Sequence, residues 1–151
     1  MTGGIAVIYI GAQTESELKE KKDRVDDAVS ATKAAIEKGV IPGGGVSLLR
    51  AISVLDLNTT GGIVLNKALQ APIKKIIENS GLESATIINK VLENDCVSYG
   101  YNAKTETYED FLMTGIIDPL KVTSSALLNS ISIANLLITT ECIIINKNNN
   151  D

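Results

Sequence analysis

Apolar residues recur every three or four positions between residues 14 and 39, and this spacing predicts a long amphipathic helix. Thr14 followed by Glu17 is a capping-box pattern, in which a hydroxyl and a carboxylate satisfy free backbone N–H groups of the first turn. Gly39 predicts the end of the helix, and Pro42 prevents it from resuming. The apolar stripe is expected to face a core and consists of Leu18, Val25, Ala28, Val29, Thr32, Ala35 and Ile36.

The rest of the pattern predicts a mainly α-helical bundle with a few short strands. Further helices are expected over residues 46–55, 63–80, 84–92 and 120–137, with Ser84 as a cap and the last helix in the core. A hairpin is expected over residues 99–108, and β-branched runs at residues 4–11 and 138–145 predict strands with open edges. The polar residues 146–151 are expected to be disordered.

Composition excludes several classes of protein. The chain has 151 residues, of which 44% are hydrophobic, and this is enough for one core. A net charge of −4 without a basic patch argues against nucleic acid. Polar residues interrupt the longest apolar stretch, so no membrane span is expected. The sequence has no histidine, and Cys96 and Cys142 are far apart, so neither a zinc site nor a Cys-His pair is expected; both thiols are expected to be reduced.

Two features of the long helix and its end are candidates for chemistry. Asp27 lies opposite the apolar stripe, and the small Ala31 and Ala34 follow on its face, which leaves room for a ligand near the carboxylate. A solvated surface acid gives the same pattern. The run 43–45 is three glycines, which lets a backbone approach a ligand closely. No Lys-Ser/Thr follows it, so it is not a Walker A loop, and a flexible turn is the alternative.

Two polar residues in the C-terminal half of the chain are also candidates for ligand binding. Asn102 offers a donor and an acceptor, which suits a ligand with both kinds of group, but a turn asparagine that bonds its own backbone fits equally well. Asp118 before Pro119 is a typical N-cap followed by proline at the first helical position. A carboxylate has enough lone pairs to cap a helix and bind a ligand at the same time.

Blocks along nearly the whole chain resemble the group I chaperonins, the heat-shock class of protein-folding machines. The similar blocks are residues 3–45, with the sequence GGIAVIYIGAQTESELKEKKDRVDDAVSATKAAIEKGVIPGGG, then YGYNAKTETYEDF, MTGIIDPLKVTSSAL and ANLLITTECIIINK. The resemblance covers the last third or so of such a protein. It implies part of the intermediate or hinge domain at 1–42, the C-terminal half of the equatorial domain at 43–145, and a tail at 146–151.

The resemblance also implies functional residues. Gly43, Gly44, Asn102, Ala103, Ile116 and Asp118 would form the adenine and ribose side of an ATP or ADP site, and Asp27 would swing in to orient or deprotonate the attacking water. Lys74 and Glu83 match charges that contact a second ring. Partners would be identical subunits, a co-chaperonin and unfolded clients. The compartment would be a bacterial cytoplasm or the matrix of an organelle, and the protein would not be secreted.

Some features of the family have no counterpart in these residues. The phosphate loop, the magnesium-holding acid and the client-binding apical domain belong to the family's N-terminal part, so the chain alone is expected to be inactive as an ATPase. Lys38 and Ser124 stand where an acid and an arginine are common in the family. This difference predicts the loss of an ion pair between the hinge portion and the equatorial portion. The Asn-rich tail replaces a glycine-methionine tail. The alternative is a stand-alone helical interaction module without nucleotide chemistry.

Overall fold

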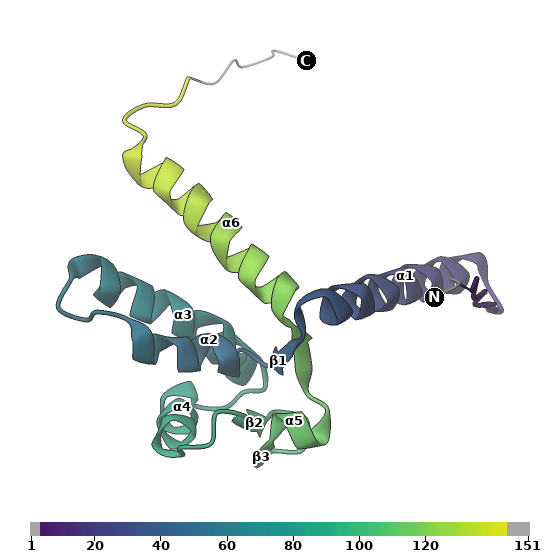
Figure 1. The fold of residues 1–151 in the computed structure, drawn as a ribbon, viewed down its shortest axis with the longest axis horizontal. Coiled ribbons are helices and arrows are strands. Elements are labelled where there is room, and N and C mark those ends of the chain that lie inside the picture. The colour runs from purple at the N-terminus through teal and green to yellow at the C-terminus, as the bar shows by residue number, and fades with distance from the viewer. Residues whose placement is uncertain (1–3, 145–151) are drawn as a thin grey trace.

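The computed structural model describes residues 4–144, and Figure 1 shows α1 and α6 leaving a helical body in different directions. The predicted fold class, mainly helical with a few short antiparallel strands, is confirmed. The elements are α1 (Glu15–Lys38), β1 (Val40–Pro42), α2 (Val46–Arg50), the 3-10 helix η1 (Ala51–Val54), α3 (Thr60–Asn79), α4 (Ser84–Glu93), β2 (Tyr99–Asn102), β3 (Thr107–Asp110), α5 (Phe111–Thr114), β4 (Ile117–Pro119) and α6 (Leu120–Thr139).

The ends of α1 are those that the sequence predicts. The Thr14 hydroxyl accepts the Glu17 N–H at 3.2 Å, and the Glu17 carboxylate accepts the N–H of Gln13 at 3.2 Å. The Lys21 ammonium lies 2.9 Å from the same carboxylate and, as the main cause, lowers the pKa of Glu17. Gly39 ends the helix with φ 83°, a left-handed conformation that favours glycine.

The apolar stripe of α1 does not face a core, which corrects the prediction. None of the residues of α1 is buried, and Ile36 is 81% exposed. Val25 and Val29 instead line a shallow groove of 440 Å³ beside Ile8. Amphipathic spacing shows which face is apolar, but another element must be present to cover that face, and no other described element covers the stripe.

The predicted strand at residues 4–11 is also wrong for the described structure, since this segment has no regular secondary structure. Ile5, within this segment, is 95% exposed. A β-strand needs a hydrogen-bonding neighbour, and no segment among residues 4–144 pairs with this one. Its β-branched residues therefore lack the partner that would make it a strand.

The core lies where α2, α3, α4 and α5 meet (Figure 1). Its buried members are Val46, Leu49, Ile73, Ile77, Ile87, Ile88, Val91 and Phe111. Arg50, at the end of α2, donates to the carbonyl oxygens of Val91 and Cys96, both at 2.8 Å. These bonds fix the end of α4 and the loop before β2, because a guanidinium can satisfy several carbonyls at once.

Two antiparallel pairs complete the body. β1 pairs with β4, with Ile41 opposite Asp118, and β2 pairs with β3, with Gly100 opposite Glu109. The predicted hairpin is thus confirmed. The cap of α4 is Glu83, whose carboxylate accepts the Ala85 N–H at 3.3 Å, so the prediction of Ser84 as the cap is wrong by one residue.

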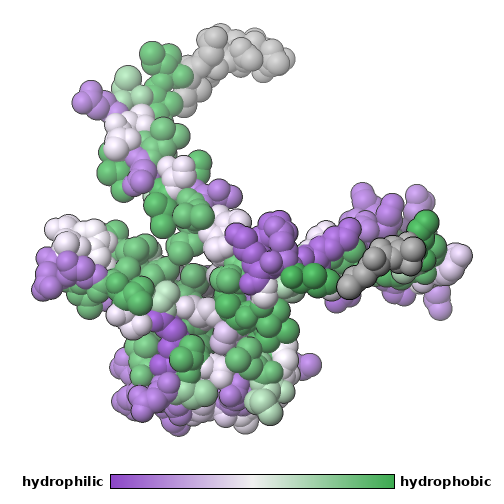
Figure 2. Space-filling model, in the orientation of Figure 1, coloured by the Kyte–Doolittle hydropathy of each residue, from purple (hydrophilic) through white to green (hydrophobic). Residues whose placement is uncertain are grey.

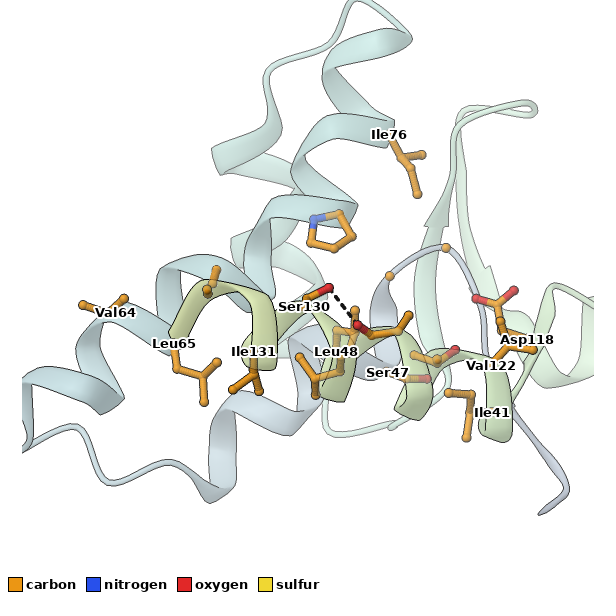
Figure 3. Close-up of a pocket in the computed structure, with 18 of the residues that line it drawn as sticks. Ile41, Ser47, Leu48, Val64, Leu65, Ile76, Asp118, Val122, Ser130 and Ile131 are labelled. Atoms are coloured by element: carbon orange, nitrogen blue, oxygen red, sulfur yellow. Dashed lines mark hydrogen bonds between the residues drawn. The ribbon is translucent and has the colours of Figure 1, made fainter. Parts of the chain in front are cut away.

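Helix α6 is rich in apolar residues but, contrary to the prediction, has no buried residue. Figure 2 shows hydrophobic side chains along it and on the body beneath it. Between α6, α2 and α3 lies a groove of 1040 Å³ (Figure 3), lined among others by Leu48, Leu65 and Ile131. Among the described residues, α6 is the one helix whose length and composition would allow it to cross a bilayer, and core helices of water-soluble proteins also pass this test.

The C-terminal end of the described chain also differs from the prediction of a strand. Ile138 and Thr139 still belong to α6, and residues 140–144 have no regular secondary structure. As at the N-terminal end, no described segment pairs with these residues. The predicted disordered tail at 146–151, like Ile145, lies outside the described residues.

Candidate functional site

The structure brings three of the predicted nucleotide-binding residues into contact. The backbone N–H of Gly43 donates to the carbonyl oxygen of Ile116 at 2.9 Å. A Cβ atom on Gly43 would lie 3.3 Å from Oδ1 of Asp118 and 3.2 Å from the Ile116 oxygen. These residues come from the β1–α2 turn and from the entry to β4, which the pairing of β1 with β4 places side by side.

The glycine turn 43–45 needs its glycines for backbone conformation and for space. Gly44 and Gly45 have φ values of 61° and 79°, which side-chain-bearing residues rarely adopt. A Cβ on Gly45 would lie 2.8 Å from the backbone nitrogen of Ile73, so the turn packs directly on α3. The predicted flexible turn is therefore a packed one, with its backbone close to the site.

Asp118 is not the N-cap of α6, which corrects the sequence prediction. Its backbone belongs to β4, the cap position is Pro119, and no side chain caps the helix. Asp118 is exposed, and no side-chain hydrogen bond within residues 4–144 involves its carboxylate, whereas the neighbouring Lys121 and Thr123 both form one. Figure 3 shows it at one end of the groove, near Ile41 and Val122. Both oxygens are thus available to donors of a ligand.

Asn102 is the last residue of β2 and is already engaged in the hairpin. Its amide nitrogen donates to Glu109 Oε1 at 2.5 Å, and its oxygen accepts the Lys104 N–H at 3.0 Å. The turn role foreseen for this residue is therefore present. A primary amide still has one N–H and one lone pair free, so a purine edge could also be bound. Ala103 begins the turn that follows.

Asp27 lies far from this cluster. It is exposed and lies eleven positions before Lys38, the last residue of α1, which corresponds to roughly 17 Å along the axis. Ala31 and Ala34, on the same face, are half-buried. The structure therefore does not bring Asp27 together with Asp118, and a role in the same site requires α1 to move.

The charges predicted to contact a second ring have local partners. Lys74 lies 3.9 Å from Glu78 one turn later on α3, and Glu83 caps α4. A different ion pair joins the first and last helices, since Lys121 of α6 pairs with Glu37 of α1. The Lys121 ammonium, by its hydrogen bond, lowers the pKa of Glu37.

Sequence reasoning missed one residue of the site, Phe111. It is the chain's only phenylalanine, is 2% exposed, and contacts Gly44 and Gly100. Its carbonyl oxygen also accepts the Ile116 N–H at 2.9 Å. The available signal was a single large aromatic residue directly after the hairpin, but a sequence cannot show which segments meet around it.

Comparison with known proteins identifies the family and the fold of the chain. A model of the TCP-1/cpn60 chaperonin family matches residues 1–148, and the chain belongs to that family. A crystal structure of a group III chaperonin in the open state superposes with a TM-score of 0.79 and 26% sequence identity over 89% of this chain. The match covers 30% of that chaperonin chain. The predicted chaperonin resemblance is confirmed, whereas the assignment to group I stays a prediction.

Proposed function

We propose that this chain forms the adenine and ribose side of an ATP site in a chaperonin that assists protein folding within a ring of subunits. The observation that carries the proposal is the contact of Gly43 with Ile116 and Asp118. A glycine backbone, a backbone carbonyl and a free carboxylate converge there, and such groups suit the hydroxyls of a nucleoside. Membership of the chaperonin family supports the choice of nucleotide.

Each group has a distinct part in the proposal. The Asp118 carboxylate accepts hydrogen bonds from the two ribose hydroxyls, since both of its oxygens are available. Ile116 is half-buried against the core, and the apolar surface that it leaves accessible is proposed to face the base. Gly43 and Gly44 let the nucleoside approach the backbone without obstruction by a Cβ atom. Asn102 contributes its remaining N–H and lone pair to the purine edge.

Magnesium and the phosphates require groups beyond this cluster. Within residues 4–144, no three His, Cys, Asp or Glu side chains gather as a metal site. When bound, magnesium would neutralise phosphate charge. The described residues fit the nucleoside, so we propose that the phosphate and metal ligands come from the remainder of a chaperonin polypeptide.

Asp27 is proposed to act in hydrolysis only when α1 has moved toward the site. A carboxylate at hydrogen-bonding distance can orient or deprotonate the attacking water. The chain by itself is proposed to be inactive as an ATPase, because it lacks a phosphate loop. ATP turnover by the isolated chain that Asp27→Ala abolishes would contradict this proposal.

The wider setting is also a proposal. The chain would work among identical subunits, with Lys74 and Glu83 available to a second ring, and with clients and a co-chaperonin bound by a separate apical domain. We propose a bacterial cytoplasm or an organelle matrix as its compartment. The division into a hinge portion at 1–42 and an equatorial portion at 43–145 stays a prediction as well.

The decisive experiment is a titration of the 151-residue chain with ADP, followed through the amide signals of Gly43 and Ile116. We expect saturable shifts at these amides, with an affinity at least tenfold lower in Asp118→Asn. This variant keeps the shape of the side chain but removes its charge. Asp26→Asn, an exposed acid of α1, is the matched control and should bind ADP as the unchanged chain does. Equal affinity in Asp118→Asn and the control would refute the site.

A second candidate function is an interaction module without nucleotide chemistry. The exposed apolar surface of α6 favours it, since Leu136 and Leu137 keep 62% and 64% of their surface accessible. This candidate predicts that ADP causes no saturable shift and that substitutions on α6, rather than at Asp118, alter what the chain binds. The same titration therefore separates the two functions.

A further inference from the structure

Phe111 occupies the point where the segments of the candidate site meet. It is the first residue of α5 and follows directly on β3, and its ring is among the largest side chains that are fully buried. Asp110 fixes its backbone by capping α5, accepting the Leu112 N–H at 2.9 Å. The Ser98 hydroxyl, as the main cause, lowers the pKa of Asp110, so the capping group is held in its charged form.

The ring supports the glycine turn by direct contact. A Cβ on Gly44 would lie 3.0 Å from Cε2 of Phe111. Such a separation is shorter than ordinary van der Waals contact, so the backbone of the turn rests directly on the ring. The position of Gly43 and Gly44 therefore depends on where the ring lies.

The same ring also supports the hairpin, through the same atoms, Cε2 and Cζ. A Cβ on Gly100 would lie 2.6 Å from Cζ of Phe111 and 2.8 Å from Cγ2 of Val46. The Phe111 N–H donates to the Ser98 carbonyl oxygen at 2.9 Å, which fixes the start of β2. Side chains two residues apart on a strand share a face, so Asn102 projects from the face that packs on this ring.

The backbone of Phe111 holds the third segment. Its carbonyl oxygen accepts the Ile116 N–H at 2.9 Å, and the Ile116 carbonyl oxygen in turn accepts the Gly43 N–H at 2.9 Å. The hydrogen bonds thus run from the hairpin through Phe111 and Ile116 to the glycine turn. Asp118 lies two residues further along β4.

We infer that Phe111 is a positioning residue, which sets the distance between the hairpin carrying Asn102 and the turn carrying Gly43. This role rests on the proposed function, because the elements that it positions are those proposed to hold the base and the ribose. Phe111 itself need not touch the nucleotide. Its ring acts as a spacer, and both neighbours are glycines at which no side chain intervenes.

The first test measures order in the apo chain and needs no ligand. Amide hydrogen exchange is measured at Gly43 and Ile116 in the site and at Val91 in α4. The protection ratio is the protection of the site amides divided by that of Val91, so any global loss of stability cancels. In Phe111→Ala we expect this ratio to fall at least tenfold. Ile77→Ala is the matched control, since Ile77 is 1% exposed in the same core, and its ratio should be unchanged.

Phe111→Leu is the variant to measure if Phe111→Ala does not fold. It keeps most of the apolar volume but not the reach of the ring, and we expect the protection ratio to fall about threefold. A ratio equal to that of Ile77→Ala in both Phe111 variants would overturn the inference, because Phe111 would then be an ordinary core residue.

A double-variant cycle tests the spacer directly. Gly100→Ala places a methyl group against the ring, and we expect it to lower the protection ratio by itself. In the double variant Gly100→Ala with Phe111→Leu, the fall in the protection ratio should be smaller than the sum of the two single falls. The reason is that the smaller leucine side chain makes room for the added methyl group. Strict additivity would show that the two residues do not constrain each other and would contradict the inference.

The second readout is ADP affinity, which separates this inference from the proposed function. In Phe111→Leu we expect ADP to bind about tenfold more weakly, at a temperature at which both chains are fully folded, whereas Ile77→Ala binds it normally. Absence of ADP binding in the unchanged chain would refute the proposed function, and the exchange ratio would still decide whether Phe111 positions the segments. Normal ADP binding in Phe111→Leu would overturn the positioning role.

Discussion

The backbone N–H of Gly43 and the carbonyl oxygen of Ile116 lie 2.9 Å apart, and this bond joins the turn after β1 to the entry of β4. It extends the pairing of β1 with β4, in which Pro42 is opposite Ile117. Residues from the two halves of the chain are thereby held at one place. The Asp118 carboxylate acquires its neighbours through this pairing and not through its own helix.

Gly43→Ala is expected to weaken ADP binding at least tenfold. The added Cβ would lie 3.2 Å from the Ile116 oxygen and 3.3 Å from Oδ1 of Asp118, within the space proposed for the ribose. The measurement is the same ADP titration. Gly61→Ala is the control, because a Cβ there meets nothing within 4 Å.

The control should even gain stability, by up to about 1 kcal/mol, since Gly61 lies in the first turn of α3 and alanine is the better helix former. ADP binding that is equally strong in both variants would contradict the proposed place of the ribose.

The contact between α1 and α6 is expected to weaken in acid. The pKa of Glu37 is lowered by Lys121, so the pair stabilises the folded arrangement above the ordinary glutamate value of 4.5. This contribution is lost as pH falls through the lowered pKa. Distances between spin labels on α1 and α6 should broaden below pH 4.5, and added salt should act in the same direction at neutral pH.

Glu37→Gln should show the broad distances already at neutral pH and should lose most of their dependence on pH. Glu20→Gln, which removes an exposed charge with a partner inside α1, is the matched control. Equal broadening in both variants would show that the Glu37–Lys121 pair does not hold α1 to α6.

Thr14→Ala is expected to fray the first turn of α1. The Thr14 hydroxyl caps the Glu17 N–H, and loss of such a cap costs about 1 kcal/mol of helix stability. Since no residue of α1 is buried, packing does not mask this loss. Amide exchange at Glu17 and Leu18 should accelerate several-fold.

Thr32→Ala is the control inside the same helix. The Thr32 hydroxyl bonds back to the Ala28 carbonyl oxygen at 2.7 Å and caps nothing, so alanine should leave α1 as helical as before or slightly more so. Faster exchange in Thr32→Ala than in Thr14→Ala would contradict the capping argument.

The isolated chain is expected to bind a hydrophobic dye and to self-associate as concentration rises. Its accessible surface is 11642 Å², whereas a compact monomer of 16.0 kDa is expected to expose about 7,400 Å². Fluorescence of the dye and light scattering would measure both effects. Leu136→Glu together with Leu128→Glu should lower both signals, because these side chains are 62% and 67% exposed on α6.

The paired change Glu15→Gln and Asp23→Asn on α1 is its control, since it alters charge without changing apolar surface. A dye signal that falls equally in this control would show that α6 is not the surface responsible.

Local signals in the sequence determined most of the elements. Thr14 and Gly39 fixed the ends of α1 because capping involves neighbours within one turn, and the spacing of aromatic residues around residues 99–108 fixed the hairpin. The resemblance of whole blocks identified the chaperonin family without any geometry.

Tertiary structure decided which residues share a site. Asp118 carried a typical N-cap sequence, yet pairing with Ile41 draws it into β4 and leaves its carboxylate uncapped. The apolar faces of α1 and α6 were visible in the sequence, but whether an apolar face is buried depends on a second element, and periodicity within one helix carries no information about that element. For the same reason Phe111 escaped notice, because its contacts with Gly44 and Gly100 exist only after the glycine turn has packed against the hairpin and α5.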